Sequence, residues 1–559
     1  MFNGKRNLSA SIAAMVGLLW LASSSATLAA PPDARLNERA RAAIGNNPHE
    51  MVNLIVTYRQ RPGNTDRAHV TRNGGSVRHE YNLINGHAIT VPAHAAEALA
   101  RNPNVERVSV DEPLRAASTP VSLPSPVGQA FAYLDALPYS GAGIGVAVID
   151  SGMRSHPDLK PAAAESFVTG SSKTDDKYGH GNHVAGIIAG SGDHSQGPYR
   201  GIAPDATMVS LRVLDEQGEG LTSDTIAALD WLLANKDEHN IRVANISLGH
   251  PVFEAAAADP LVQAVEALWD AGVVVVCSAG NAGRDGYGTI TSPGNSRKVI
   301  TVGSVTSWGD DDTANDIVST YSSRGPTRID RVVKPDLVAP GNRMISIKAK
   351  DSYLAKNEED RLIYAPGKAT AEYLQLSGTS MSAAVVSGAV ALMLEQDPGL
   401  TPDTIKARLM RSAAKVDFPD VFATGAGILD IDAALSETGM VIDTALSPRV
   451  MRDELQVRMG FEDTGLLWGG EQWALGYLWS DGYLWSDSSV EADGYLWSDG
   501  YLWSDGYLWS DGYLWSDGYL WSDGYLWSDG YLWSDGYLWS DDAMDADGYL
   551  WSDRELVDD

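Results

Sequence analysis

The chain has 559 residues, of which 44% are apolar, so it is long enough for several domains with a substantial core. Its formal net charge of −31 argues against a surface that binds nucleic acid or anionic membranes, because both need basic patches. From residue 441 onward we count 25 acidic and 4 basic residues, so 25 − 4 = 21 of the net negative charges fall there.

The first 30 residues predict an export signal. Lys5 and Arg6 give a basic start, residues 11–22 are apolar, and small residues lead to Ala30. A buried core helix is the alternative interpretation. The apolar run is short for a bilayer span, and no later segment is long and apolar enough. We therefore expect a secreted, extracellular product without a membrane span, with attachment to the cell surface left open.

The next part of the chain, residues 31–120, predicts a prosegment with a small α+β unit at about 50–115. Strand patterns occur at 51–58, 81–91 and 105–110, and a helix pattern at 93–101. Residues 85–91, Asn-Gly-His-Ala-Ile-Thr-Val, and 103–108, Pro-Asn-Val-Glu-Arg-Val, resemble the inhibitory prosegments of subtilisin-like proteases. A generic α+β module would look similar.

Residues 121–437 predict an α/β domain with a mostly parallel sheet and helices on both faces. Strand patterns alternate with helix patterns, the strands at 145–149, 208–214, 241–248, 273–277 and 299–302, and the helices at 223–235, 261–271 and 382–396. Active sites of such sheets lie at the carboxyl ends of the strands. The single cysteine, Cys277, falls in a valine run, which predicts a core residue and excludes a disulfide within the chain.

Three positions, each in its own glycine-rich context, are the candidate catalytic residues. Asp150 ends a predicted strand, His180 lies in Gly-His-Gly, and Ser380 lies in Gly-Thr-Ser-Met-Ser before an apolar helix. Alone, each fits a simpler role: a turn-capping carboxylate, a metal pair with His183, or a helix-capping serine. Together they have the chain order Asp, His, Ser of the subtilisin triad. We assign Ser380 as the nucleophile, His180 as general base and acid, and Asp150 as the group that orients the imidazole.

With these motifs, the chain resembles the subtilisin-like serine peptidases, or subtilases. The resemblance implies that Asn281, in Ser-Ala-Gly-Asn, donates to the developing oxyanion together with the backbone N–H of Ser380. It also implies that substrate backbone is bound as an added strand by the following residues: Gly218, Glu219, Gly220, Ser247, Leu248, Gly249, Ala279 and Gly280. The implied activity is hydrolysis of proteins or peptides through an acyl-enzyme intermediate.

The chain departs from the family pattern at three positions near the triad. Ala384 and Val385 stand where the family usually has proline and then often histidine, and Asn182 stands where threonine is usual. None of the three transfers a proton in the mechanism. We therefore expect altered packing around the site but the same chemistry.

No cofactor and no catalytic metal are expected. Asp158 resembles one calcium ligand of the family, but the loop 190–201 adds only Asp193 and His194 as candidate side chains. Calcium needs six to eight oxygen ligands. A structural calcium ion at Asp158 is therefore one interpretation, and a solvated surface aspartate is the alternative.

The prosegment is expected to act as the inhibitor of its own enzyme. Its last strand, 105–110, would lead into the substrate groove, and self-cleavage would fall between about Arg115 and Leu123. A separately folding unit can also supply contacts to a parallel sheet, which forms slowly from distant pairings.

The C-terminal part is predicted to be a linker at 438–475 and a repeat tail at 476–559. Tyr-Leu-Trp-Ser-Asp occurs eleven times, mostly every six residues. Asp-Gly between short strands favours an antiparallel hairpin meander, while a hexapeptide solenoid is the alternative. The tail is expected to bind a surface, a polysaccharide or itself; the simpler alternative is a spacer that is removed during maturation.

Two other functions use the same features differently. In one, the peptidase-like body is only a scaffold, and the aromatic repeats make a surface-binding or assembly protein. In the other, the triad carries out acyl transfer or peptide ligation instead of hydrolysis.

Overall fold

The computed structural model describes residues 32–117, 138–307, 315–415, 420–442, 444–453 and 458–461, and short strands between 477 and 558. From residue 451 onward only the backbone is described. The predicted export signal at 1–30 lies outside the described residues.

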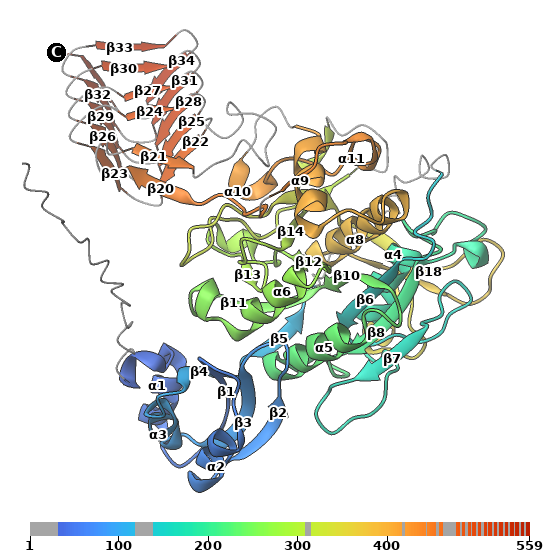
Figure 1. Cartoon of the computed structure of the whole chain (residues 1–559). Coiled ribbons are helices and arrows are strands. Elements are labelled where there is room, and N and C mark those ends of the chain that lie inside the picture. The colour runs from blue at the N-terminus through green and yellow to red at the C-terminus, as the bar shows by residue number, and fades with distance from the viewer. Residues whose placement is uncertain are drawn as a thin grey trace, which may run out of the picture.

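The N-terminal unit is a four-stranded antiparallel sheet with helices, shown in blue in Figure 1. The sheet order is β2-β3-β1-β4, and the elements are α1 (Glu38–Asn46), β1 (Met51–Tyr58), α2 (Asn64–Arg72), β2 (Ser76–Glu80), β3 (Gly86–Pro92), α3 (Ala95–Ala100) and β4 (Val105–Val110). Helix α2 has no counterpart in the predicted elements. Its start is stabilised by the Asp66 carboxylate, which accepts the Gly63 N–H at 2.9 Å.

The central sheet has eight strands and is parallel except for one edge strand. Its order is β15-β14-β12-β10-β6-β8-β7, with β16 also paired to β14. The strands are β6 (Gly145–Asp150), β7 (Ala163–Ser166), β8 (Thr207–Arg212), β10 (Ile241–Ile246), β12 (Val274–Ser278), β14 (Ile300–Thr306), β15 (Ile317–Val318) and β16 (Leu337–Pro340). Strands β6 and β12 are buried along their whole length, as continuous apolar runs require in a sheet that is covered on both faces.

Helices cover both faces of this sheet (Figure 1). Helices α4 (His180–Ala189) and α8 (Thr379–Gln396) pack together, and α5 (Thr222–Asn235) packs beside α6 (Pro260–Asp270). Helix α6 begins where the Asp259 carboxylate accepts the Leu261 N–H at 2.9 Å, with Pro260 as its first residue. The predicted mostly parallel α/β fold is therefore confirmed. Shorter elements complete the unit: α7 (Tyr353–Asn357), α9 (Pro402–Ser412), α10 (Val421–Thr424), α11 (Ile431–Ser436), and a sheet of β17 (Met344–Ile347), β18 (Leu362–Ile363) and β19 (Tyr373–Leu376).

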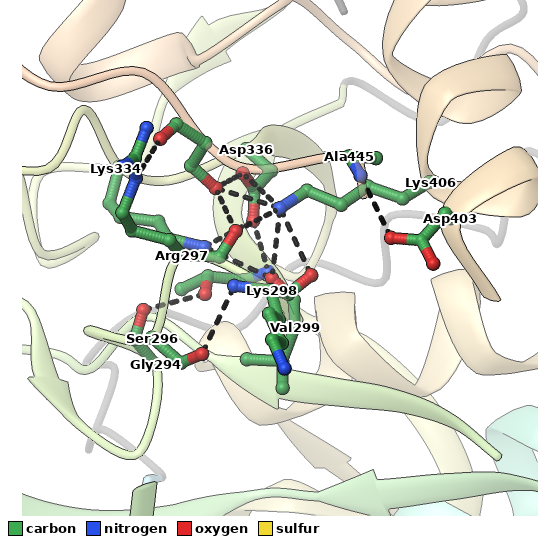
Figure 2. A network of polar contacts seen from close by, with 12 residues as sticks. Gly294, Ser296, Arg297, Lys298, Val299, Lys334, Asp336, Asp403, Lys406 and Ala445 are labelled. Atoms are coloured by element: carbon green, nitrogen blue, oxygen red, sulfur yellow. Dashed lines mark hydrogen bonds and ion pairs between the residues drawn. The ribbon is translucent and has the colours of Figure 1, made fainter. Parts of the chain in front are cut away.

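Residues 438–442 and 444–450, which we call the C-terminal strap, are bonded to the peptidase unit and do not form the linker predicted from residue 438. Within the strap, the backbone N–H of Ser447 donates to the Arg297 carbonyl at 2.8 Å, and its Oγ donates to Asp336 at 2.5 Å. Figure 2 shows the polar network around Asp336 and Lys406, both of which are fully buried. The linker prediction was wrong for the strap. The strap has no sequence periodicity, but it supplies hydrogen-bond partners to buried charged side chains.

The repeats form three parallel sheets, shown in red in Figure 1. Each strand pairs with the strand 18 residues later, so Tyr477 pairs with Tyr495 and Trp479 with Trp497. The antiparallel meander was therefore wrong, and the solenoid alternative fits, because three six-residue repeats complete one circuit and place equal positions in register. The fourteen strands run from β22 (Tyr477–Ser480) to β35 (Glu555–Asp558).

The tail strands that lack Tyr-Leu-Trp-Ser all lie at sheet edges. Strand β24 (Val490–Ala492) begins one sheet and β33 (Ala543–Ala546) ends it, while β35 ends another. Every strand inside the three sheets belongs to a Tyr-Leu-Trp-Ser repeat. Irregular sequence at the ends of a repeat stack is typical of capping units.

Candidate active site

The fold brings Asp150 and His180 together at the carboxyl end of the central sheet. Asp150 is the last residue of β6 and His180 the first of α4. The imidazole Nδ1 lies 2.9 Å from both carboxylate oxygens, and both side chains are completely buried. Helix α4 can approach this closely because a Cβ atom at Gly181 would lie 2.2 Å from the Gly152 carbonyl oxygen. A carboxylate in this position fixes the ring and stabilises its protonated form.

A second buried carboxylate, Asp176, lies behind the pair and was missed by the sequence reasoning. The Ser151 hydroxyl lies 3.1 Å from Asp150 Oδ1 and 2.9 Å from Asp176 Oδ1. Asp176 also accepts the backbone N–H groups of Gly179, at 2.6 Å, and Asn182, at 2.8 Å. Burial raises the pKa of Asp176 to about 6, although these donors act in the opposite direction. Asp176 holds the start of α4 in place beneath the imidazole.

Ser380 is the second residue of α8, which begins after Gly378. Its Oγ lies 2.7 Å from the carbonyl oxygen of Ala117 and 3.2 Å from that of Ser247. His180 Nε2 is buried and has no hydrogen-bond partner. In this structure, Ser380 Oγ therefore donates to two backbone carbonyls, one of which belongs to the chain that occupies the site, and it makes no hydrogen bond to His180.

Asn281 presents an unpaired N–H donor beside the serine. Its Oδ1 accepts the Thr379 N–H at 3.0 Å and the Thr379 hydroxyl at 3.0 Å, while its Nδ2 is buried without a partner. Thr379 therefore fixes the orientation of the amide and was not singled out from the sequence. A preorganised donor without a partner suits an oxygen on which negative charge develops.

The occupying chain is a short strand of the N-terminal part, β5 (Pro113–Ala116), inserted between two peptidase strands. It pairs antiparallel with β9 (Glu219–Leu221) and β11 (Leu248–Pro251). The Ala116 N–H donates to the Gly218 carbonyl and the Ala117 N–H to the Ser247 carbonyl, both at 3.2 Å. The predicted segments 218–220 and 247–249 thus flank an extended chain, as in strand addition.

Ala279 and Gly280 make no hydrogen bond to β5, unlike the two segments that flank it. The Ala279 N–H donates to Val302 at 3.0 Å, and the Gly280 N–H donates to the Thr379 hydroxyl at 3.2 Å. Ala279 is therefore bonded to β14, and Gly280 is bonded to the start of α8. They position Asn281, the next residue along the chain.

The positions that depart from the family pattern are accommodated by hydrogen bonding at Asn182 and by burial at Ala384 and Val385. The Asn182 side chain accepts the Arg154 N–H at 2.8 Å and donates to the Arg154 carbonyl at 2.8 Å. Ala384 and Val385 are completely buried within α8.

His183 does not form a metal site with His180. Its Nε2 lies 3.1 Å from the Met344 carbonyl oxygen and 3.0 Å from that of Leu374, so this nitrogen is the ring's donor. Burial lowers the pKa of His183 to about 3, so the ring is neutral. Cys277 is buried as predicted, and burial raises the pKa of its thiol to about 12, so it is no nucleophile.

The surroundings of Asp158 do not fit a calcium ion. One carboxylate oxygen accepts the Ser191 hydroxyl at 3.1 Å and the His194 N–H at 2.7 Å, and the other accepts the Tyr373 hydroxyl. Asp193 is exposed. Within the described ranges, no group of three or more histidine, cysteine, aspartate or glutamate side chains could hold a metal ion.

Comparison with known proteins relates this chain to one peptidase family. A model of the subtilase family matches residues 141–429. Serine protease AprX of Bacillus subtilis (strain 168) is 40% identical over 304 residues, which are 52% of this chain and 66% of AprX. Subtilisin DY of Bacillus licheniformis is 33% identical over 298 residues, which are 53% of this chain and 92% of that protein.

Among solved structures, the chain is similar to fervidolysin from Fervidobacterium pennivorans, which is described as a keratinolytic enzyme related to subtilisin. The TM-score is 0.55 at 24% identity, over 70% of this chain and 61% of fervidolysin. This similarity concerns the fold alone. In the part of the chain that the structure describes, no helix combines the length and apolarity needed to cross a bilayer.

Proposed function

The chain belongs to the subtilase family, and we propose that it is a secreted serine endopeptidase made as a self-inhibited, self-processing precursor. Its substrates are proteins or peptides bound as an extended strand. One observation carries the proposal: the carbonyl oxygen of Ala117 lies 2.7 Å from Ser380 Oγ, at the end of a strand that fills the groove.

In the proposed chemistry, each of four side chains has its own role. Ser380 Oγ attacks the Ala117 carbonyl carbon while His180 Nε2 takes the hydroxyl proton, and Asp150 stabilises the imidazolium. The Asn281 amide and the Ser380 N–H donate to the oxyanion. The bond to the nitrogen of residue 118 then breaks, and His180 returns the proton to that amine. A water molecule, activated by the same imidazole, hydrolyses the acyl-enzyme.

Contacts between the N-terminal unit and α5 support an inhibitor role for the prosegment. The Asp111 carboxylate accepts the Ser223 N–H at 2.8 Å and the Ser223 hydroxyl at 2.7 Å, and the Glu112 carbonyl accepts the Thr222 N–H at 3.0 Å. The residue before α5, Leu221, offers no side-chain cap of its own. The prosegment thus satisfies donors that the peptidase unit leaves open.

Activity needs no cofactor in this proposal. Asp158 takes protein donors on both oxygens, which supports a structure held without calcium at that position. Chelators are accordingly expected to leave activity intact.

We propose that the tail binds a surface or a polysaccharide in preference to pairing its sheet edges with a second copy of the chain. An exposed edge of identical repeats is a template for adding strands from another chain. The irregular strands β24, β33 and β35 occupy three of the six sheet edges and support limited self-association at those edges, whereas the repeat strands β22, β23 and β34 form the other three.

The proposal is tested by labelling the mature protein with a fluorophosphonate, which reacts with activated serine hydroxyls. Peptide mapping should find the label on Ser380. A processed, folded protein that neither takes the label nor hydrolyses casein would contradict the proposal.

A further inference from the structure

An acidic loop borders the strand that fills the groove. Residues 215–219 are Asp-Glu-Gln-Gly-Glu, with three carboxylates in five positions. The last of these, Glu219, is the direct partner of Arg115 in the pairing of β5 with β9. Arg115 Nη2 lies 2.8 Å from Glu219 Oε1. An ion pair therefore joins the occupying chain to the rim of the groove.

The three acidic side chains of the loop have different roles. Asp215 shapes the loop, because its Oδ1 accepts the N–H of Gln217 at 2.8 Å and that of Glu219 at 3.1 Å. Glu216 is exposed and makes no hydrogen bond or ion pair with any residue that the structure describes. Glu219 has its backbone fixed in β9, while its carboxylate faces the groove strand. Of the three, Glu219 is thus the carboxylate placed to contact a bound chain.

The register of the bound strand is fixed at two points. The Ala117 carbonyl is at Ser380, and the Leu114 side chain is fully buried. Alternate residues of an extended strand face opposite sides, so Arg115 lies on the side opposite Leu114 and stays largely exposed. Any chain that is bound in this register places its third residue before the scissile bond opposite Glu219.

We infer that Glu219 is a specificity-determining residue that selects a basic side chain at the third position before the scissile bond. The inference rests on the proposed endopeptidase function and narrows its substrates to extended chains with a cationic residue there. Because the pair is solvent-exposed, the preference is modest, about threefold to tenfold for arginine over glutamate. Salt weakens it, since the screening length falls to about 3 Å at 1 M.

The test compares peptide substrates on the mature enzyme. Three quenched fluorescent peptides carry residues 113–120 with arginine, glutamine or glutamate at position 115. The enzymes are the wild type, Glu219→Arg and, as matched control, Glu216→Arg, which places the same charge on the same loop away from the strand. The readout is kcat/KM at low salt and in 1 M NaCl.

The wild type and Glu216→Arg should both prefer the arginine peptide, whereas Glu219→Arg should prefer the glutamate peptide. Both preferences should shrink in 1 M NaCl. Equal kcat/KM for the arginine and glutamate peptides, or a preference that Glu219→Arg leaves unchanged, overturns this inference alone. Absence of cleavage of all three peptides overturns the endopeptidase function and this inference with it.

Discussion

The Nζ atom of Lys406 donates a 2.7 Å hydrogen bond to the hydroxyl of Ser447, 41 residues along the chain. Ser447 lies in the C-terminal strap, beyond the 141–429 region matched by the family model. Its hydroxyl also donates to Asp336, which accepts from Lys334 as well. The strap thus completes the hydrogen bonding of a buried cluster with two ammonium groups and one carboxylate.

This cluster predicts where the peptidase unit ends. A chain truncated after residue 453 keeps the strap and should keep kcat/KM within about twofold. A chain truncated after residue 437 leaves buried charged groups with lost partners, which costs about 3 kcal/mol or more. It should not give a folded, processed enzyme. Equal yield and activity of the two truncations would contradict this role of the strap.

Asn281 is predicted to act on turnover and not on binding. Replacing Asn281 by alanine removes one oxyanion donor and should lower kcat by about 10²–10³, with little change in KM. The measurement is steady-state hydrolysis of a peptide by the mature enzyme. Asn295, which is also buried and makes none of the site contacts described above, provides the matched Asn295→Ala control. A mainly raised KM in Asn281→Ala would contradict the assignment.

His183 is predicted to make the free energy of unfolding depend on pH. Burial lowers its folded-state pKa from 6.5 to about 3, so protons bind the unfolded state first as the pH falls. The stability from the neutral ring is complete above about pH 6.5 and is lost between 6.5 and about 3. In the Ser380→Ala precursor, which prevents self-digestion, we expect about 2 kcal/mol of loss between pH 6.5 and 4.5 from this group.

The same precursor with His183→Gln should lack that part of the pH dependence, as seen by denaturant unfolding at each pH. His49, which is exposed, provides the control His49→Gln. Parallel pH profiles for His183→Gln and the parent precursor would show that the ring is not held neutral.

The irregular tail strands are predicted to prevent assembly. In one variant, residues 543–546 and 555–558 are both replaced by Tyr-Leu-Trp-Ser. The edge strands of two sheets then have the repeat sequence and can pair with strands of another chain. Sedimentation velocity should show large assemblies for this variant and not for the wild type. Assembly of the wild type to the same extent would contradict the capping role.

Strands and helices of the peptidase unit could be predicted from sequence because their signals are local. The valine runs that end at Asp150 and Cys277 are strands in the structure. Helix α8 begins at Thr379, three residues before the predicted start, because the helix pattern was recognised from its apolar residues and not from the turn at Gly378. The motifs around Asp150 and His180 marked two residues that the fold joins by a hydrogen bond, and the motif around Ser380 marked a hydroxyl that contacts the occupying chain.

Features that depend on long-range contacts could not be predicted. Thr379 orients Asn281 across 98 positions of sequence, and Ser447 reaches Asp336 across 111. The scissile position was confined only to 115–123, because strand register decides which carbonyl reaches Ser380. The tail was assigned the wrong pairing because Asp-Gly is a local hairpin signal, whereas the parallel sheets join strands 18 residues apart.

The position of Ala117 makes self-processing the most direct test of the account. Intact-mass and N-terminal analysis of the wild type should find a mature chain that begins at residue 118, while Ser380→Ala should remain joined across that bond. Processing at this bond in Ser380→Ala, or a wild-type cut elsewhere with this bond intact, would contradict the account.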